Sequence, residues 1–93
     1  MKSKSTSLCI EETLLDAINR KRLVRNNVIF LALARFQPEH FRARPRAPHK
    51  VVRILINPEL EKISQGLLDK LPGVNRSQLI NAALEEYLLE EKQ

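Results

Sequence analysis

The chain has 93 residues, of which 43% are hydrophobic and 29% charged, and a formal net charge of +5. A chain of this size can bury one compact core, or one core shared by two small units, and has no room for a separate catalytic domain. The composition is ordinary for a folded protein and excludes one that is largely disordered.

The N-terminal segment can form a strand followed by two helices. Strand residues alternate between two faces, so the inward face would consist of Thr6, Leu8 and Ile10. The outward face would consist of Ser5, Ser7 and Cys9. The apolar residues Leu14, Leu15 and Ile18 then indicate a short first helix, and residues 23–36 a second. The alternative is an N-terminal pair of amphipathic helices that packs on a dimer of the downstream part.

Residues 37–50 are expected to be a linker. They contain Pro38, Pro45 and Pro48, which favour an extended backbone that spans about 3 Å per residue. The linker arginines Arg42, Arg44 and Arg46, together with Lys2 and Lys4, could contact a nucleic-acid backbone. Equally, a basic linker could serve only to keep the chain soluble.

Residues 51–56 predict a second strand. Its core face would consist of Val52, Ile54 and Ile56, and its outward face of Val51, Arg53 and Leu55. Asn57 and Pro58 mark the start of a helix, because the Asn side chain can accept from a free amide and proline suits the first helical position.

Two further helices are predicted in the C-terminal part. Apolar residues line one side of the first, which ends near Pro72 and Gly73; they are Leu60, Ile63, Leu67 and Leu71. Asn75 and Gln78 predict a capping box at the start of the second. This second helix is apolar over a wide arc, formed by Leu79, Ile80, Ala83, Leu84, Tyr87 and Leu88. A unit of about 43 residues cannot cover that arc alone, so a second copy is required.

The order strand, helix, turn, helix over residues 51–89 resembles the ribbon-helix-helix family of DNA-binding proteins, which includes the Arc, MetJ and CopG types. The resemblance implies that two strands pair antiparallel into a ribbon that enters the major groove of DNA. It also implies that the second helices of the two units interlock beneath this ribbon.

The first half of the chain can be a second, divergent copy of this unit. A shift of 51 residues places residues 23–36 on 74–87, with agreement at five apolar positions: Val28, Ile29, Ala32, Leu33 and Phe36. The strands match at a shift of 46, which predicts a first helix five residues shorter than its counterpart. Val24 stands in the place of Asn75, so Asn26 or Asn27 would cap a helix that starts later.

We therefore expect a mainly α fold with a short two-stranded antiparallel ribbon, in which strand, helix and helix occur twice. Residues 1–36 would form the first, divergent ribbon-helix-helix unit and residues 51–93 the second. This tandem arrangement resembles that of TraY-type plasmid-transfer proteins. The two units could pair within one chain or across a homodimer.

The resemblance also implies which residues contact DNA. Among the outward strand residues, Arg53 would make a bidentate contact to guanine. Ser5 and Ser7 could form hydrogen bonds with either base type. Val51 or Leu55 could contact a thymine methyl group. Cys9 completes this set of base-reading candidates. Phosphate binding is implied at the starts of the second helices, by Asn75, Arg76 and Ser77 and by Arg25, Asn26 and Asn27. The alternative for Arg53 is a solvated strand charge.

The basic charge of the chain agrees with a polyanionic partner. Residues 1–36 carry seven basic and three acidic groups, residues 37–50 carry four and one, and residues 51–93 carry five and seven. Lys and Arg that displace condensed counterions gain affinity for nucleic acid. The charge distribution alone is equally compatible with an ordinary, mildly basic protein that does not bind nucleic acid.

Other classes of function find little support in the sequence. One cysteine and two histidines, His40 and His49, are too few for a disulfide framework or a closed zinc site, and we expect both histidines to be solvated. No catalytic constellation or phosphate loop is found, so we expect neither an enzyme nor a cofactor. The longest apolar stretch, residues 28–34, is too short to span a bilayer, and no signal-peptide pattern is evident. We expect a cytoplasmic protein associated with the nucleoid.

The sequence thus predicts sequence-specific binding of double-stranded DNA, in a transcriptional regulator or an accessory factor for plasmid transfer. The alternative is an antitoxin that binds a toxin partner and regulates its own operon. Antitoxins of that kind usually extend beyond the second helix in a partner-binding tail, so we expect this function less.

Overall fold

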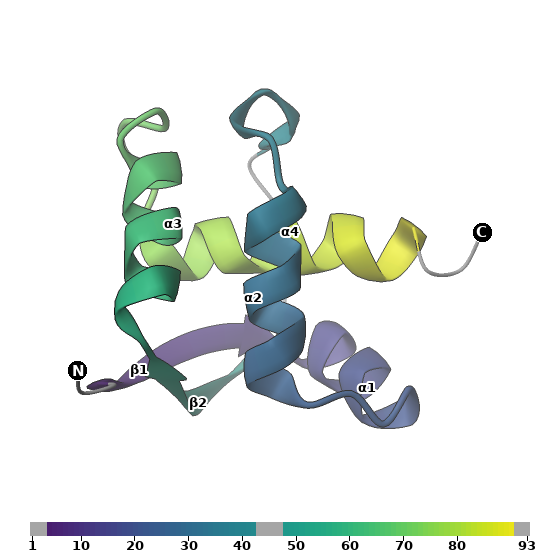
Figure 1. Ribbon diagram of the computed structural model, residues 1–93. Helices are drawn as coiled ribbons and strands as arrows, with labels where there is room; N and C mark the ends of the chain where they lie inside the picture. Colours follow the sequence, from purple (N-terminus) through teal and green to yellow (C-terminus); the bar gives the residue numbers. More distant parts are fainter. Residues whose placement is uncertain (1–3, 43–47, 91–93) are drawn as a thin grey trace.

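The computed structural model describes residues 4–42 and 48–90 of the chain. These residues form a mainly α fold with one two-stranded antiparallel sheet, as the sequence predicts. The elements in chain order are β1 (Lys4–Glu11), α1 (Glu12–Arg20), α2 (Arg25–Arg35), the 3-10 helix η1 (Pro38–His40), β2 (His49–Ile56), α3 (Pro58–Leu68) and α4 (Arg76–Glu90). Figure 1 shows the strands on one side of the molecule, with α2 and α4 crossing beside them.

The two strands pair with each other within one chain. Lys4 lies opposite Ile56 and Glu11 opposite His49, with every residue between them in register, so the two extended segments predicted from the sequence are confirmed. The amide of Glu12 continues the pairing by donating to the carbonyl of Pro48 at 3.0 Å. As a result β2 begins at His49, inside the segment expected to be a linker.

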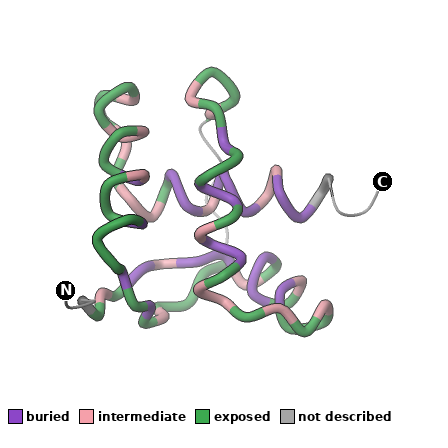
Figure 2. The backbone as a smooth tube through the Cα atoms, in the orientation of Figure 1, coloured by how far each residue is buried: buried purple, intermediate pink, exposed green. Residues whose placement is uncertain are grey.

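The core lies between the inner face of this sheet and the helices. Leu8 and Ile10 of β1 and Ile54 and Ile56 of β2 are buried, as the alternation of strand residues predicts. The burial colours of Figure 2 alternate along β1 in the same way. From α1, the side chains of Leu14, Leu15 and Ile18 complete this part of the core.

Helix α4 is the centre of the packing. Its buried residues occupy several sides of the helix; they are Leu79, Ile80, Ala82, Ala83, Leu84, Tyr87 and Leu88. The helix contacts β1 and each of the other three α-helices described. The wide apolar arc seen in the sequence is therefore covered by four separate elements, because no single neighbour could bury it.

Helices α2 and α4 pack against each other through matching positions. Of the five apolar residues that agree at a shift of 51, four lie in α2 and the fifth, Phe36, follows its last residue. All five are buried, and so are their counterparts in α4: Leu79, Ile80, Ala83, Leu84 and Tyr87. None of the helices described is both long and apolar enough to cross a membrane.

The two halves differ in how their helices are connected. Helix α1 has 9 residues and α3 has 11, and the connection that follows is also shorter in the first half, residues 21–24 against 69–75. The expectation of a first helix five residues shorter is therefore wrong, since helix and turn share the difference. Helix α3 ends at Leu68, earlier than the last apolar position, Leu71.

The helix starts follow the predictions in the second half and depart from them in the first. Asn57 accepts from the amide of Leu60 at 2.7 Å, which confirms the predicted cap of α3. The capping box is confirmed as well, because Asn75 and Gln78 exchange bonds of 2.8 and 2.9 Å. Helix α2, however, begins directly after Val24 without a side-chain cap, so the expectation of a later start capped by Asn26 or Asn27 is wrong.

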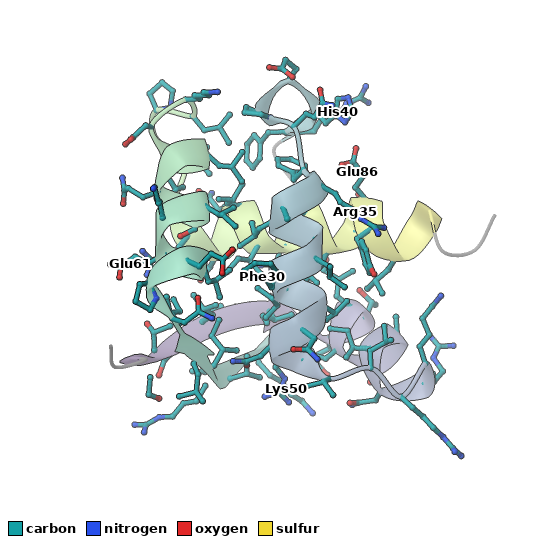
Figure 3. The ribbon with its side chains drawn as sticks, viewed as in Figure 1. Phe30, Arg35, His40, Lys50, Glu61 and Glu86 are labelled. Atoms are coloured by element: carbon teal, nitrogen blue, oxygen red, sulfur yellow. The ribbon has the colours of Figure 1, made fainter. Side chains whose placement is uncertain are left out.

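Part of the expected linker is structured. His40 of η1 makes a 2.7 Å bond from Nδ1 to the Glu86 carboxylate on α4, although its side chain stays 53% exposed. His49 belongs to β2, so neither histidine lies in a structureless segment. Figure 3 shows His40, Glu86 and Arg35 gathered at the end of α2 that points away from the strands. Arg44, Arg46 and Lys2 lie outside the described residues.

Both helix connections use a residue with left-handed backbone geometry. In the second half it is Gly73, with φ 81°, and in the first half it is Arg22, with φ 57°. A residue with a Cβ atom loses about 1–2 kcal/mol in this conformation, whereas glycine adopts it freely.

Replacing Arg22 with glycine should therefore stabilise the fold. The relief of left-handed strain exceeds the roughly 0.5–1 kcal/mol that glycine costs in backbone entropy, so the free energy of unfolding should rise by up to about 1 kcal/mol. Urea denaturation of Arg22→Gly and the unsubstituted chain measures this difference. The reverse change at the matching position, Gly73→Arg, should destabilise, and equal stability of all three proteins would contradict the account.

Candidate functional site

The outer face of the sheet carries all six residues that the sequence analysis selected for base reading. The register places them as three cross-strand pairs: Ser5 with Leu55, Ser7 with Arg53, and Cys9 with Val51. Five of the six are exposed and Cys9 is half-buried. We call these six residues the outer face; the described structure has no helix packed over them.

The outer face has a positively charged side chain at its centre and apolar side chains toward both ends of β2. Arg53 lies at the centre, opposite the hydroxyl of Ser7, and an apolar side chain lies on each side of it along β2. Val51 is 67% and Leu55 56% exposed, the first and third largest values among the large hydrophobic side chains that stay exposed in the described part of the chain. The guanidinium of Arg53 can donate several hydrogen bonds to a ligand. The apolar side chains beside it would contribute binding free energy if a ligand buried them.

The dimensions of the outer face are set by the strand geometry. From Ser5 to Cys9 the strand advances four residues, or about 13 Å at 3.3 Å per residue. The outer face is therefore a surface about 13 Å long and two strands wide. For comparison, the major groove of B-DNA is about 12 Å wide and 8.5 Å deep, and it admits a two-stranded β-ribbon.

Two helix starts hold the ribbon from its edges. At the start of α4, the hydroxyl of Ser77 accepts from the amide of Cys9 at 3.2 Å. At the start of α2, the side-chain amide of Asn26 donates to the carbonyl of Leu55 at 2.9 Å. The two helix starts are thus fixed to opposite ends of the ribbon, one on each strand.

Asn81 adds a second connection between α4 and β1. Its Oδ1 accepts from the amide of Glu11 at 3.0 Å, and its Nδ2 donates to the carbonyl of Cys9 at 2.9 Å. The same Nδ2 lies 2.9 Å from the carbonyl of Ser77 within α4. Asn81 was not among the residues predicted from the sequence, although it is a polar side chain between Ile80 and Ala82 in a helix that is otherwise apolar there.

Two of the residues predicted to bind phosphate also make contacts within the fold. The side chains of Ser77 and Asn26 bond to strand backbone, so they position the ribbon. Asn75 is likewise engaged in the capping box. The groups at the two helix starts that make none of these contacts are the other backbone amides and the side chains of Asn27, Arg25 and Arg76.

Arg76 and Arg25 occupy matching places in the first turns of α4 and α2. Both are half-buried, and the Nε atom of Arg76 is buried without a hydrogen-bond partner. Asn27 is exposed on the first turn of α2, where no side chain caps the helix. Free amides and cations at a helix start favour a negative ligand, since the helix dipole acts in the same direction.

Other groups with potential chemistry do not form a site in the part of the chain described. Residues 4–42 and 48–90 hold no group of three or more His, Cys, Asp or Glu side chains placed to bind a metal ion. The thiol of Cys9 is free. Arg35 lies over the ring of Tyr87, 5.3 Å from its centroid, which joins the ends of α2 and α4 away from the outer face.

Comparisons of the chain with models of protein families, with curated proteins and with solved structures found no match.

If Asn81 holds β1 in place, removing its amide should destabilise the protein. In Asn81→Ala the partly buried amide of Glu11 and carbonyl of Cys9 lose a partner, at a cost of about 1–3 kcal/mol. Urea denaturation measures the change, and faster hydrogen exchange at the Glu11 amide locates it. Gln65→Ala is a matched control, because Gln65 bonds Asp69 on an exposed helix surface and should cost no more than about 0.5 kcal/mol. Equal losses in both variants would argue against a holding role for Asn81.

Proposed function

We propose that this protein binds double-stranded DNA sequence-specifically, by inserting the outer face of the β1–β2 ribbon into the major groove. The single observation that carries the proposal is the exposed Arg53 at the centre of a ribbon whose other face directs Leu8, Ile10, Ile54 and Ile56 into the core. A ribbon held this firmly presents its side chains in fixed positions, which direct readout of bases requires.

The base contacts follow from the chemistry of each position. The guanidinium of Arg53 can donate two hydrogen bonds to the O6 and N7 atoms of guanine. Leu55 and Val51 can each cover a thymine methyl group, and the hydroxyls of Ser5 and Ser7 can bond either base type. Neither Leu55 nor Val51 can distinguish hydrogen-bond donors from acceptors, so each contributes to specificity only through contact with a thymine methyl group.

A tandem ribbon-helix-helix arrangement is the fold that accounts best for these features. The shift of 51 that aligns the helices places Asn26 on Ser77, and the shift of 46 that aligns the strands places Cys9 on Leu55. The bond between Asn26 and Leu55 is thus the counterpart of the bond between Ser77 and Cys9. Two unlike halves that make corresponding contacts support a relation by an approximate two-fold axis.

The two helix starts would bind the phosphates on either side of the groove. They are attached to opposite ends of the ribbon through Asn26 and Ser77, so their free amides flank any DNA that the ribbon enters. Arg25 and Arg76 add a cation at each place. Phosphate contacts of this kind position the protein and carry no sequence information.

The unlike strands give the proposed site an asymmetric sequence. Counterparts on the two strands are Ser5 and Val51, Ser7 and Arg53, and Cys9 and Leu55. Since none of these pairs is identical, the bases read by one strand should differ from those read by the other, and the subsite should not be palindromic. A regulator of transcription or an accessory factor in plasmid transfer would use such a site.

Arg53→Ala tests the proposal on a site selected from random DNA. Loss of the bidentate contact should cost about 1–3 kcal/mol in discrimination at one base pair, with little change in binding to unrelated DNA. Titrations on the selected site and on single-base variants measure this.

Lys50→Ala is the matched control, because Lys50 is an exposed cation of the same strand whose position belongs to the opposite face. Any effect of Lys50→Ala should be the same on all sequences. An Arg53→Ala variant that weakens binding equally on selected and random DNA would remove Arg53 from the reading role.

A further inference from the structure

The connection between α1 and α2 carries an unusual concentration of positive charge. Four of the six residues 20–25 are basic and none is acidic, namely Arg20, Lys21, Arg22 and Arg25; we call this set the basic turn. The corresponding connection in the second half, residues 68–76, contains Lys70, Arg76 and Asp69, for a net charge of +1 against +4. Figure 1 shows the two connections on opposite flanks of the molecule, so the charge is one-sided.

The cations of the basic turn are not neutralised within the fold. Arg20 donates from Nε to the backbone carbonyl of Asp16 at 3.5 Å, and no acidic side chain in the described part of the chain forms an ion pair with any of the four. Arg20 and Arg22 are exposed, and Lys21 and Arg25 are half-buried. Crowded like charges repel each other, and a polyanion relieves that repulsion.

The turn itself does not need these side chains. Its shape is closed by backbone bonds, in which the amides of Lys21, Arg22 and Leu23 donate to carbonyls of α1 at 3.0–3.1 Å. Its left-handed residue is Arg22, where the other half has Gly73. A long cation kept in a conformation that suits glycine better is a cost to the fold, and such positions point to a use for the side chain.

The basic turn leads directly into the first turn of α2. Arg25 is the first residue of that helix, and its neighbour Asn26 is bonded to the carbonyl of Leu55 on the ribbon. The basic turn is therefore attached to one end of the outer face. DNA held by the outer face would pass its phosphate backbone along this flank.

We propose that the basic turn is a one-sided phosphate-binding surface, which extends the DNA contact beyond one end of the ribbon and gives the complex a polarity. This inference rests on the proposed function. The ligand is the phosphate backbone of double-stranded DNA, contacted without regard to base sequence, and the opposite flank makes fewer such contacts because its charge is lower.

Arg22→Gly is the central test, because glycine suits the backbone and removes only the side chain. The affinity for a mixed-sequence DNA duplex is measured over a range of salt concentrations for the unsubstituted chain, Arg22→Gly, and the double variant Lys21→Gln with Arg22→Gly. Each lost phosphate contact should reduce the slope of log affinity against log salt by about 1, so the slopes should fall by about 1 and about 2. Thermal unfolding of Arg22→Gly should occur no lower than in the unsubstituted chain.

Lys62→Gln is the charge-matched control, since Lys62 is an exposed cation within α3 and should leave the slope unchanged. If the unsubstituted chain binds DNA and Arg22→Gly has the same slope, or Lys62→Gln lowers it equally, this inference fails and the proposed function stands. If the unsubstituted chain does not bind DNA, both fail. On a selected site, phosphate ethylation should interfere further out on one side, and Arg22→Gly should lose that extension.

Discussion

The fold depends on the burial of α4. This helix is apolar on several sides, and its buried residues contact β1 and each of the other α-helices described. Exposing even part of this surface would forfeit roughly 25 cal/mol for each Å² returned to water. Three of the four elements that cover α4, namely α1, α2 and β1, belong to the first half of the chain. That need for cover joins two unlike halves into one core.

The same packing determines where the ribbon lies and which way it faces. Leu8, Ile10, Ile54 and Ile56 commit one face of the sheet to the core, and a register slip of one residue would turn these side chains to water. The edges are secured as well, because Ser77, Asn81 and Asn26 bond to strand backbone. Edge groups that are already paired also cannot recruit a foreign strand, which is a hazard of short sheets. The outer face is the part of the sheet that neither the core nor these edge contacts cover.

Much of this arrangement could be predicted from the sequence because it follows local rules. The period-two alternation identified both strands and their faces, and the Asn57 cap and the Asn75–Gln78 box identified two helix starts. The start of α2 could not be found in this way, because Val24 offers no cap and the helix is fixed by a contact between Asn26 and a strand that is distant in sequence. Asn81 escaped for the same reason: its partners are 70 and 72 residues away. The early start of β2 required knowing that Glu11 lies opposite His49. Local patterns identify elements, whereas long-range polar contacts set their boundaries.

The location of β1 and β2 on a single polypeptide has a consequence for how the molecule behaves at low abundance. A ribbon assembled from two separate subunits comes apart on dilution, because its stability depends on the concentration of chains. Here each strand is tethered to its partner, so the pairing is unimolecular and its effective concentration is set by the length of the intervening chain. Dilution alone should therefore not separate β1 from β2, and because the two strands are encoded together, each can change in sequence without having to pair with an identical copy of itself.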